Sequence, residues 1–490
     1  MKRATDDGGR RTERRLDAFF NPRRIAVVGA SEKGMYPAGI LRNLIEYGYP
    51  GEIYPVNPRR ESVFGLPCYP DVSRTPQPAD LAILTIPREG VPDVLRQCLV
   101  VGVPAALIIS AGFAEADDEG RRLQAEIAAL VAGTPLTVVG PNCAGLANIP
   151  NRVVATRLPA PPKAGPVSFV SQSGALMMAL YGLFADRHVG MSRLISLGNQ
   201  LDVTLSESLA YLAADPQTRV IAAFVEGLQD GPVFVEALRR ALEVGKPVVL
   251  IKSGRTASGE RAAATHTGAL VGSDRVFEAV CRQFGAIRVD DIGELVDTAQ
   301  LIAAFGDRTG ERGHISVVTQ SGGLGSLTAD LAELAGLHLP TPGSWLQGRL
   351  RGLDHLAGGG DLGNPADVRG PAVIGAAAAE TLAPFMDDPE TDVVLLLLAK
   401  AAVREEDAGT AEAIIAAARR SPKPLAVVWV GQRYLVRSPE WPLAHRLLVE
   451  AGVPLFEQPG ACVRALARVI GYRRFRAAWL ADGEVARATG

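Results

Sequence analysis

The sequence predicts an α/β protein built on parallel sheets, and two observations carry this prediction. From Ile25 onward, short apolar runs alternate with longer amphipathic runs, which is the pattern of successive βα units. Part of the chain is also repeated, because GPVSFVSQSGAL at 165–176 resembles GHISVVTQSGGL at 313–324. A chain of 490 residues has room for about three domains. We therefore expect one α/β domain followed by two copies of another.

The first domain is expected to contain five buried strands. They are RIAVVGAS at 24–31, EIYPVNP at 52–58, LAILTIP at 81–87, AALIISAGF at 105–113 and LTVVGPN at 136–142. The segments 92–102 and 119–133 between them have helical patterns. Ligands of such sheets bind at the carboxyl ends of the strands. The proline-rich stretch 151–165 is predicted to be a linker to the second domain.

Two further landmarks support the duplication. GNQLDV at 198–203 parallels GNPADV at 363–368, and DPQTRV at 215–220 parallels DPETDV at 388–393. The distance between the copies is too long for a solenoid period and suits a duplicated globular domain. The polar stretch GDRTGERG, just before the second copy, is the expected boundary. After that copy, residues 472–490 are expected to form a short helix and a tail.

Composition disfavours several classes of function. The net charge is −2, so no overall basic field points to nucleic acid or an anionic membrane. Five scattered cysteines include no CxxC pair, which argues against a metal site and favours a cytoplasmic protein. Apolar runs are far shorter than the roughly 20 residues of a membrane span. The polar residues 1–15 are expected to be a disordered tail.

The first strand runs into GASEKG at 29–34, a candidate phosphate loop. Gly29 allows a sharp turn, after which helix amides can hold a pyrophosphate. The dinucleotide fingerprint requires glycine at position 31, which is serine here. Arg59 and Arg60 follow the second strand and suit an extra ribose phosphate, as on NADP or coenzyme A. An NADP-dependent dehydrogenase is therefore one interpretation, which the missing glycine disfavours.

His266 lies in AAATHTGAL at 262–270, with no Cys, Asp, Glu or second His within five residues. Its small neighbours favour a mobile or closely packed loop. SQSGAL at 171–176 follows a buried strand and starts a helix, whose free amides form an anion site. An imidazole above that site could carry a phosphoryl group. Glu226, after another strand, is a candidate to orient the ring.

These motifs together resemble the NDP-forming acyl-CoA synthetases, the superfamily of succinyl-CoA ligase. GAS, VNP, SAGF and GPNC follow one another as in the CoA-binding domain of that family. KSGRTASGERAAATHTGAL at 252–270 resembles its phosphohistidine segment. The resemblance covers about residues 16–475. It implies a Rossmann-like CoA-binding domain at 16–150 and two flavodoxin-like, succinyl-CoA-ligase-like domains at 163–306 and 312–475, the first with the phosphohistidine.

The resemblance implies a role for each predicted site residue. His266 would be phosphorylated, and Glu226 would orient it. Two helix N-termini would hold the phosphate through Ser171, Gln172, Ser173, Gly174, Ser321, Gly322 and Gly323. Coenzyme A would contact Gly29, Ala30, Ser31, Lys33, Asn57, Pro58, Pro87, Ser110, Gly112, Asn142 and Cys143. A solvated Lys33 and a merely packed Cys143 remain open alternatives.

The implied activity is that of an alpha subunit, acyl-CoA + phosphate + ADP = acid + CoA + ATP, through a phosphohistidine. The sequence has no GxxxxGK[ST] loop, so ADP or ATP with Mg²⁺ would bind to another chain. The resemblance implies an ATP-grasp beta subunit in a heterotetramer, acting on a small carboxylic acid. In the second copy, Ala399 stands at the position of Glu226 and THTGAL is missing. A catalytically silent CoA-binding regulator is the alternative.

Overall fold

The computed structural model describes residues 15–158, 160–267, 272–357, 360–368, 370–399, 406–430 and 442–488, without the side chains of 263–267, 406 and 483–488. The chain forms two compact units, Met1–Ile292 and Gly293–Gly490. The predicted boundary at 306–313 lies later than this division. Helix α10 (Ile292–Phe305) belongs with the second unit, where its Glu294 pairs with Arg464 and Arg468 at 3.1 and 2.7 Å.

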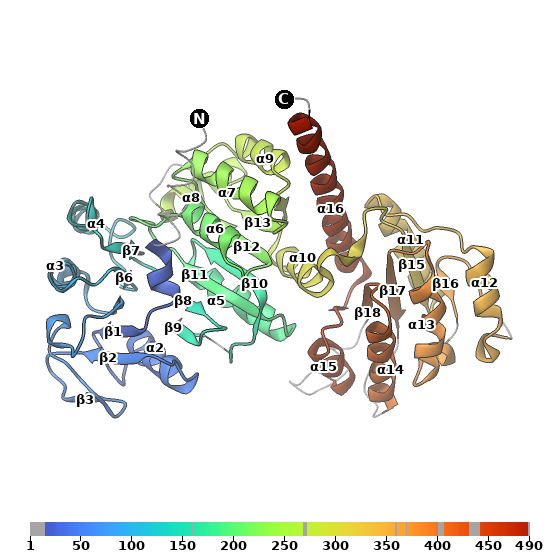
Figure 1. The fold of residues 1–490 in the computed structure, drawn as a ribbon, viewed down its shortest axis with the longest axis horizontal. Coiled ribbons are helices and arrows are strands. Elements are labelled where there is room, and N and C mark those ends of the chain that lie inside the picture. The colour runs from blue at the N-terminus through green and yellow to red at the C-terminus, as the bar shows by residue number, and fades with distance from the viewer. Residues whose placement is uncertain are drawn as a thin grey trace. The chain divides into compact units, whose positions relative to one another are not determined.

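The first sheet is parallel, with the strand order β2-β1-β5-β6-β7. It belongs to the blue, N-terminal part of the ribbon, where β1 and β2 are labelled (Figure 1). Its strands are β1 (Arg24–Val28), β2 (Glu52–Val56), β5 (Leu81–Leu84), β6 (Ala105–Ile108) and β7 (Thr137–Val139). The helices between them are α2 (Met35–Glu46), α3 (Val91–Val101) and α4 (Asp118–Val131), and a hairpin is formed by β3 (Ser62–Val63) and β4 (Leu66–Pro67). All five strands predicted for this domain are confirmed.

Alternate residues of β1 enter two different cores. Ile25 and Val27 pack in a cluster with α2 and the second sheet, whereas Ala26 and Val28 pack with α3 and α4. Successive side chains of a strand point to opposite faces. Because this parallel sheet is covered on both faces, its strands are apolar throughout instead of alternating.

The second sheet has the order β14-β13-β12-β10-β11-β8-β9. Its strands are β8 (Gly145–Asn148), β9 (Val153–Thr156), β10 (Ala164–Ser171), β11 (Met191–Ser196), β12 (Val220–Val225), β13 (Val248–Lys252) and β14 (Ile287–Arg288). Its helices are α5 (Gly174–Asp186), α6 (Leu205–Ala214), α7 (Gly231–Glu243), α8 (Ala257–Thr267) and α9 (Asp274–Gln283). The prediction of a linker at 151–165 is wrong, because the buried residues of β9 pair antiparallel with β8.

The third sheet repeats the topology of the second with the order β16-β15-β17-β18-β19. Its strands are β15 (Ile315–Thr319), β16 (Ala366–Asp367), β17 (Val393–Leu398), β18 (Leu425–Trp429) and β19 (Leu455–Phe456). Its helices are α11 (Gly322–Leu334), α12 (Ser344–Arg351), α13 (Ala377–Asp387), α14 (Glu406–Arg420), α15 (Leu443–Glu450) and α16 (Pro459–Ala488). In both sheets the first strand lies between the second and the third, so the predicted duplication is confirmed.

Of the two further pairs of matched motifs, one pair occupies equivalent positions in the structure and the other does not. Asp215 and Asp388 occupy equivalent positions, since each accepts a hydrogen bond from the threonine three residues later, at 2.6 and 2.8 Å. The match of GNQLDV with GNPADV is wrong as a structural equivalence. Residues 198–203 follow β11, whereas GNPADV at 363–368 contains β16 itself. A short motif can recur on either side of a strand without occupying the same place.

The C-terminal segment differs from its prediction as a short helix and a tail. It belongs to α16, which runs without interruption from Pro459 to Ala488. Its composition, rich in Ala and Arg, favours a continued helix. Arg474 also anchors α16 by donating to the carbonyl oxygen of Glu311 at 2.6 Å. Within the described residues, no helix is both long and apolar enough to cross a membrane.

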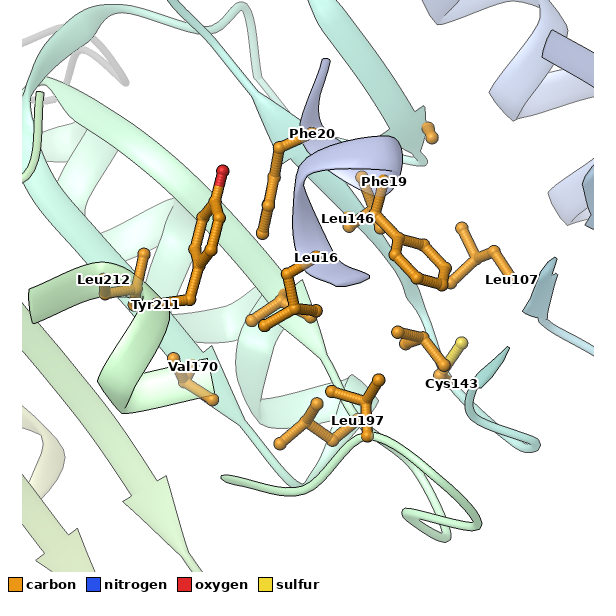
Figure 2. Close-up of a cluster of buried hydrophobic side chains, with 14 of the residues drawn as sticks. Leu16, Phe19, Phe20, Leu107, Cys143, Leu146, Val170, Leu197, Tyr211 and Leu212 are labelled. Atoms are coloured by element: carbon orange, nitrogen blue, oxygen red, sulfur yellow. The ribbon is translucent and has the colours of Figure 1, made fainter. Parts of the chain in front are cut away.

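A short N-terminal helix, residues 15–20, packs between the first two sheets. Figure 2 shows Leu16, Phe19 and Phe20 pointing into the cluster between them. Phe20 stacks on Tyr211 with 5.2 Å between ring centroids. Arg15 was predicted to lie in the disordered tail, but it forms ion pairs with Asp202 and Glu207, the latter at 2.8 Å. The rest of that predicted tail, 1–14, lies outside the described residues.

Candidate functional site

Helix α5 begins in a turn that prepares an anion site. Ser171 Oγ donates to the carbonyl oxygen of Ser173 at 2.6 Å and accepts from its amide at 3.1 Å. Ser173 is the N-cap, and its Oγ accepts from the amide of Leu176 at 3.3 Å. A helix start held in this way presents first-turn amides and the positive end of the helix dipole.

Helix α11 begins in the same way in the second unit. Thr319 Oγ1 accepts from the amide of Ser321 at 3.1 Å, and Ser321 Oγ accepts from Leu324 at 3.4 Å. One feature differs, because a Cβ added at Gly322 would lie 3.1 Å from Asp367 Oδ2. A carboxylate beside a helix start stabilises it and competes with another anion. The contacts predicted between phosphate and Ser321, Gly322 and Gly323 therefore stay a prediction.

A cavity of about 290 Å³ in the first unit joins three groups of predicted site residues. They come from the carboxyl ends of β7, β10 and β12. The predicted residues in its lining are Asn142, Cys143, Gln172, Ser173, Gly174 and Glu226. The lining also includes Tyr36, Asn199, Gln200 and Gln229, which the sequence did not single out. Parallel strands end at one edge, so segments distant in sequence meet there.

Glu226 follows β12 directly and is half-buried in this lining. Its backbone amide donates to Gln172 Oε1, so the turn after β12 is tied to the turn before α5. The structure thus brings Glu226 to the α5 helix start. This is the neighbourhood that the sequence predicted.

His266 belongs to α8, a helix where the sequence predicted a loop. The loop prediction is wrong over 257–267 because the run of alanines has high helix propensity. The side chain of His266 lies outside the described residues. Its predicted phosphorylation therefore stays a prediction.

The turn after β1 has the backbone required of a phosphate loop. Gly29 has φ +88°, and a Cβ there would lie 2.9 Å from the Thr85 carbonyl oxygen. Helix α2 starts at Met35 without a side-chain cap, so its first amides remain available to an anion. The site lies where the strand order reverses between β1 and β5, the usual ligand position of such sheets.

The other residues predicted around this loop hold one another in place. Asn57 Nδ2 donates to the carbonyl oxygen of Ala30 at 2.9 Å, and Ser31 Oγ accepts from the amide of Lys33 at 3.0 Å. Lys33 is exposed. Pro58 follows Asn57 in the turn after β2, and Pro87 caps the short helix 88–90.

The polar groups of the strand end at 110–113 are bound within the chain. Ser110 Oγ donates to the carbonyl oxygen of Ile86 at 2.5 Å. The amides of Gly112 and Phe113 donate to Glu115 Oε1 at 2.6 and 3.1 Å. The Gly112 amide is thus already bound by a carboxylate of this chain, and the predicted contacts of Ser110 and Gly112 with coenzyme A stay a prediction. Burial raises the pKa of Glu115, but hydrogen bonds from Asn199 and these amides outweigh it and hold the pKa below its ordinary value.

Asn199 links this strand end to the cavity. Its Nδ2 donates to Glu115 Oε2 at 2.5 Å, and its Oδ1 accepts from Asn142 Nδ2 at 3.3 Å. Asn142 itself has φ +57°, a conformation that asparagine tolerates. The sequence did not single out Glu115 or Asn199 as site residues. Asn199 lies in GNQLDV, a motif that served only as support for the duplication.

Cys143 lines the cavity but is only 4% exposed. Its Sγ donates to the carbonyl oxygen of Ile108 at 3.2 Å. Burial raises the pKa of the thiol to about 12. This geometry favours the interpretation of Cys143 as a packed residue over that of a coenzyme A contact.

We expect Cys143 to react with iodoacetamide at pH 8 much more slowly than the half-buried Cys68. The thiolate is the reactive species, and a pKa of about 12 leaves roughly one thiol in 10⁴ ionised at pH 8. Peptide mapping by mass spectrometry over a time course measures both rates. In denaturant the two cysteines should react alike. Equal rates in the folded chain would contradict the assignment.

Two family models match the chain, and together they cover most of the first unit and the start of the second. The model described as "CoA binding domain" matches residues 23–149. The model described as "Succinyl-CoA ligase like flavodoxin domain" matches residues 164–302. These matches correspond to the first sheet and to the parallel strands of the second.

Relatives match nearly the whole chain. It is 33% identical to the acetate–CoA ligase [ADP-forming] I subunit alpha of Pyrococcus furiosus over 94% of this chain and 98% of that protein. It is 34% identical to the type II alpha subunit of the same organism over 91% and 95%. It is also similar to the solved dinucleotide-forming acetyl-coenzyme A synthetase 1 of Ca. Korarchaeum cryptofilum in complex with phosphate and ADP. That likeness has a TM-score of 0.85 and 31% identity, and it covers 94% of this chain and 97% of the other.

Proposed function

The chain belongs to the ADP-forming acetate–CoA ligase alpha subunits, among the NDP-forming acyl-CoA synthetases, and from this premise we propose that its phosphoryl carrier is His266. The chain is accordingly an acid–thiol ligase with a CoA-binding domain, as its sequence predicts. The relatives give no support to a catalytically silent CoA-binding regulator. The proposed reaction is acyl-CoA + phosphate + ADP = acid + CoA + ATP, with a small carboxylic acid as product.

The observation that carries the proposed site is the cavity shared by Asn142, Ser173 and Glu226. Phosphate would bind at the α5 helix start, through the amide of Gly174 and the positive end of the helix dipole. The thioester would lie beside Asn142 in the same cavity. Nucleophile and electrophile would thus be held together, which lowers the entropic part of the barrier.

Three steps complete the proposed reaction. A phosphate oxygen attacks the thioester carbonyl, the CoA thiolate leaves, and an acyl phosphate forms. The imidazole of His266 then takes the phosphoryl group and releases the acid, and ADP takes the group from His266. Glu226 would accept a hydrogen bond from the other ring nitrogen and keep the attacking nitrogen unprotonated. Positioning and electrostatic stabilisation dominate such transfers.

Coenzyme A would be held by the residues around the β1 turn. Gly29 has no side chain to obstruct a pyrophosphate, and its amide donates to the carbonyl oxygen of Val56 at 2.9 Å, which fixes the loop. The uncapped start of α2 supplies free amides. The exposed Arg59 and Arg60 stand after β2, where a ribose 3′-phosphate can be neutralised.

ADP or ATP and Mg²⁺ would bind to an ATP-grasp beta subunit. The name "alpha subunit" of the relatives implies a separate partner chain, and we propose a heterotetramer of the two. The cysteine content of the sequence supports a cytoplasmic enzyme.

The proposed function is tested with the purified chain and an ATP-grasp partner. The chain by itself should bind coenzyme A and make no thioester from acid, coenzyme A and ATP. With the partner, a panel of short carboxylic acids should reveal ATP-dependent thioester synthesis. Turnover by the isolated chain would contradict the division of labour, and no turnover with any acid by the complete complex would contradict the activity.

Gly29→Ala should weaken coenzyme A binding by about tenfold. The new Cβ would lie 2.9 Å from the Thr85 carbonyl oxygen in a backbone with φ +88°. The loop must shift to relieve this contact, and a tenfold loss of affinity corresponds to about 1.4 kcal/mol of binding free energy. Gly65→Ala is the matched control, since Gly65 has φ +76° but nothing within 4 Å of an added Cβ. Isothermal titration with coenzyme A compares the two, and equal affinities would rule out a close backbone contact at Gly29.

A further inference from the structure

Gln172 makes an unusual set of hydrogen bonds for a residue in a phosphate loop. Its side chain is nearly buried, with the residue 5% exposed. Its Oε1 accepts from the amides of Glu226 and Gly227, the latter at 3.0 Å. Its Nε2 donates to the carbonyl oxygen of Gly227 at 2.7 Å. Three hydrogen bonds therefore join this one side chain to a single two-residue turn.

These bonds use most of what an amide side chain offers. An amide oxygen has two acceptor sites, and both are taken by the turn after β12. One of the two N–H groups is also taken. The backbone amide of Gln172 faces Phe224, whose carbonyl oxygen lies 3.4 Å away. Gln172 thus has little capacity left to bind phosphate, although the sequence predicts that contact.

Gln172 also connects two parts of the cavity lining, the helix start at Ser173 and the turn at Glu226, whose separation must stay fixed. It precedes Ser173, the N-cap of α5, and it holds the amide of Glu226. Ser173 and Glu226 both line the cavity. The direction in which the Glu226 side chain leaves the backbone is thereby set relative to the helix start.

The second repeat provides an internal comparison. Gln320 stands between Thr319 and Ser321 as Gln172 stands between two serines. Ala399 follows β17 where Glu226 follows β12. Gln320 Oε1 is buried and has no hydrogen-bond partner among the residues that the structure describes. The glutamine is present in both repeats, and in the repeat that carries the glutamate it holds the turn after the third strand.

We infer that Gln172 is a positioning residue, which sets the Glu226 carboxylate relative to the phosphate site without binding phosphate itself. The inference rests on the proposed role of Glu226. A displacement of about 1 Å in a catalytic group can cost a hundredfold in rate. Removing the three hydrogen bonds should therefore slow phosphoryl transfer and leave phosphate affinity almost unchanged.

The test uses Gln172→Met, which keeps the length of the side chain and removes its hydrogen bonds. The complete enzyme with its partner subunit is assayed for the rate of phosphoenzyme formation and for the KM of phosphate. We expect phosphoryl transfer to slow by about tenfold to a hundredfold, with the KM of phosphate within about twofold of the wild-type value. A raised KM with an unchanged rate would overturn the inference and identify Gln172 as a phosphate ligand.

A double-mutant cycle with Glu226→Gln decides whether Gln172 acts through Glu226. Groups that act as one unit are not additive, so the double variant should be no slower than Glu226→Gln. Multiplying effects would overturn the inference. A wild-type rate in Glu226→Gln would instead contradict the proposed role of Glu226. A slow Glu226→Gln beside a wild-type Gln172→Met would overturn the inference and leave that role intact.

Gln300→Met is the matched control, since Gln300 lies on α10 outside the predicted site and is also 5% exposed. It should leave the transfer rate unchanged. Thermal unfolding of each variant separates slow transfer from loss of the fold. If Gln172→Met fails to fold, Gln172→Asn, which retains the amide but shortens its reach, should fold and transfer slowly with an unchanged KM; a wild-type rate would overturn the inference.

Discussion

His266→Asn should abolish the phosphoenzyme and reduce overall turnover by at least about 10³-fold. Removal of a covalent carrier leaves only the binding and electrostatic contributions of the site. The measurement uses labelled ATP and the partner subunit, followed by precipitation of the protein. Wild-type enzyme should carry an acid-labile, base-stable label, as a phosphorylated nitrogen requires, and the variant should carry none.

The first half of the reaction distinguishes a lost carrier from a collapsed site. Phosphate-dependent conversion of acyl-CoA to acyl phosphate needs no imidazole carrier, so it should persist in His266→Asn. His188→Asn is a matched control, because His188 lies outside the predicted site at φ +53°, where asparagine is well tolerated. A label retained by His266→Asn would refute the assignment of the carrier.

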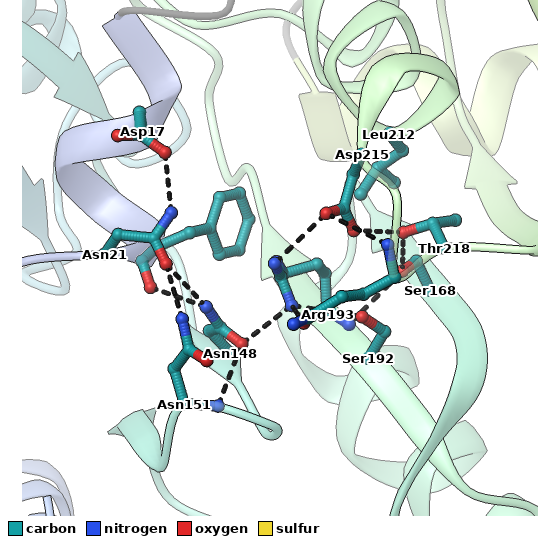
Figure 3. Close-up of polar contacts among 12 residues, drawn as sticks. Asp17, Asn21, Asn148, Asn151, Ser168, Ser192, Arg193, Leu212, Asp215 and Thr218 are labelled. Carbon is teal, nitrogen blue, oxygen red and sulfur yellow. Dashed lines mark hydrogen bonds and ion pairs between the residues drawn. The ribbon is translucent and has the colours of Figure 1, made fainter.

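Asp215→Ala should lower the free energy of unfolding of the first unit by about 3–5 kcal/mol. The side chains of Arg193 and Asp215 are 4% and 5% exposed, and Arg193 Nη2 lies 3.1 Å from Asp215 Oδ1. Figure 3 shows this pair joined to Asn148 and Thr218. Without its carboxylate, the buried guanidinium would remain charged and uncompensated. Denaturant titration followed by far-UV circular dichroism measures the loss.

Two further variants test whether burial of the Arg193–Asp215 pair causes this loss of stability. Glu126→Ala removes one partner of Arg96 in a pair whose side chains are 49% and 46% exposed, and it should cost at most about 1 kcal/mol. Replacing Arg193 and Asp215 together by Met and Leu should recover much of the stability, because no buried charge remains. A cost for Asp215→Ala as small as that for Glu126→Ala would contradict the argument.

Much of the candidate site could be predicted because its motifs end parallel strands. Asn142, Ser173 and Glu226 follow β7, β10 and β12, and the carboxyl ends of such strands meet at one edge. Their common cavity is therefore a consequence of the βα pattern. The contribution of Glu115 could not be predicted in this way. Its carboxylate binds the amides of Gly112 and Phe113 and, across 84 positions of the sequence, Asn199.

Features of the fold that depend on neighbouring residues could also be predicted from the sequence. Apolar runs of the right length specified the strands of the first sheet, and turn residues such as Gly29 specified where they end. The duplicated QSG motifs specified that two domains share one topology. These signals lie within a few residues of the structure that they encode.

Contacts between residues far apart in the sequence decided the rest of the fold and of the candidate site. The β8–β9 hairpin joined the second sheet because β11 offered it an edge, a fact that 151–165 does not encode. Gln172 became bound to the Glu226–Gly227 turn because β10 and β12 are neighbours in the sheet. By itself the sequence predicted which residues would carry the chemistry, and it determined which strands present them. Only tertiary structure decided which polar groups are already satisfied by the chain and which remain available to a ligand, because each hydrogen bond depends on two partners that packing must bring together.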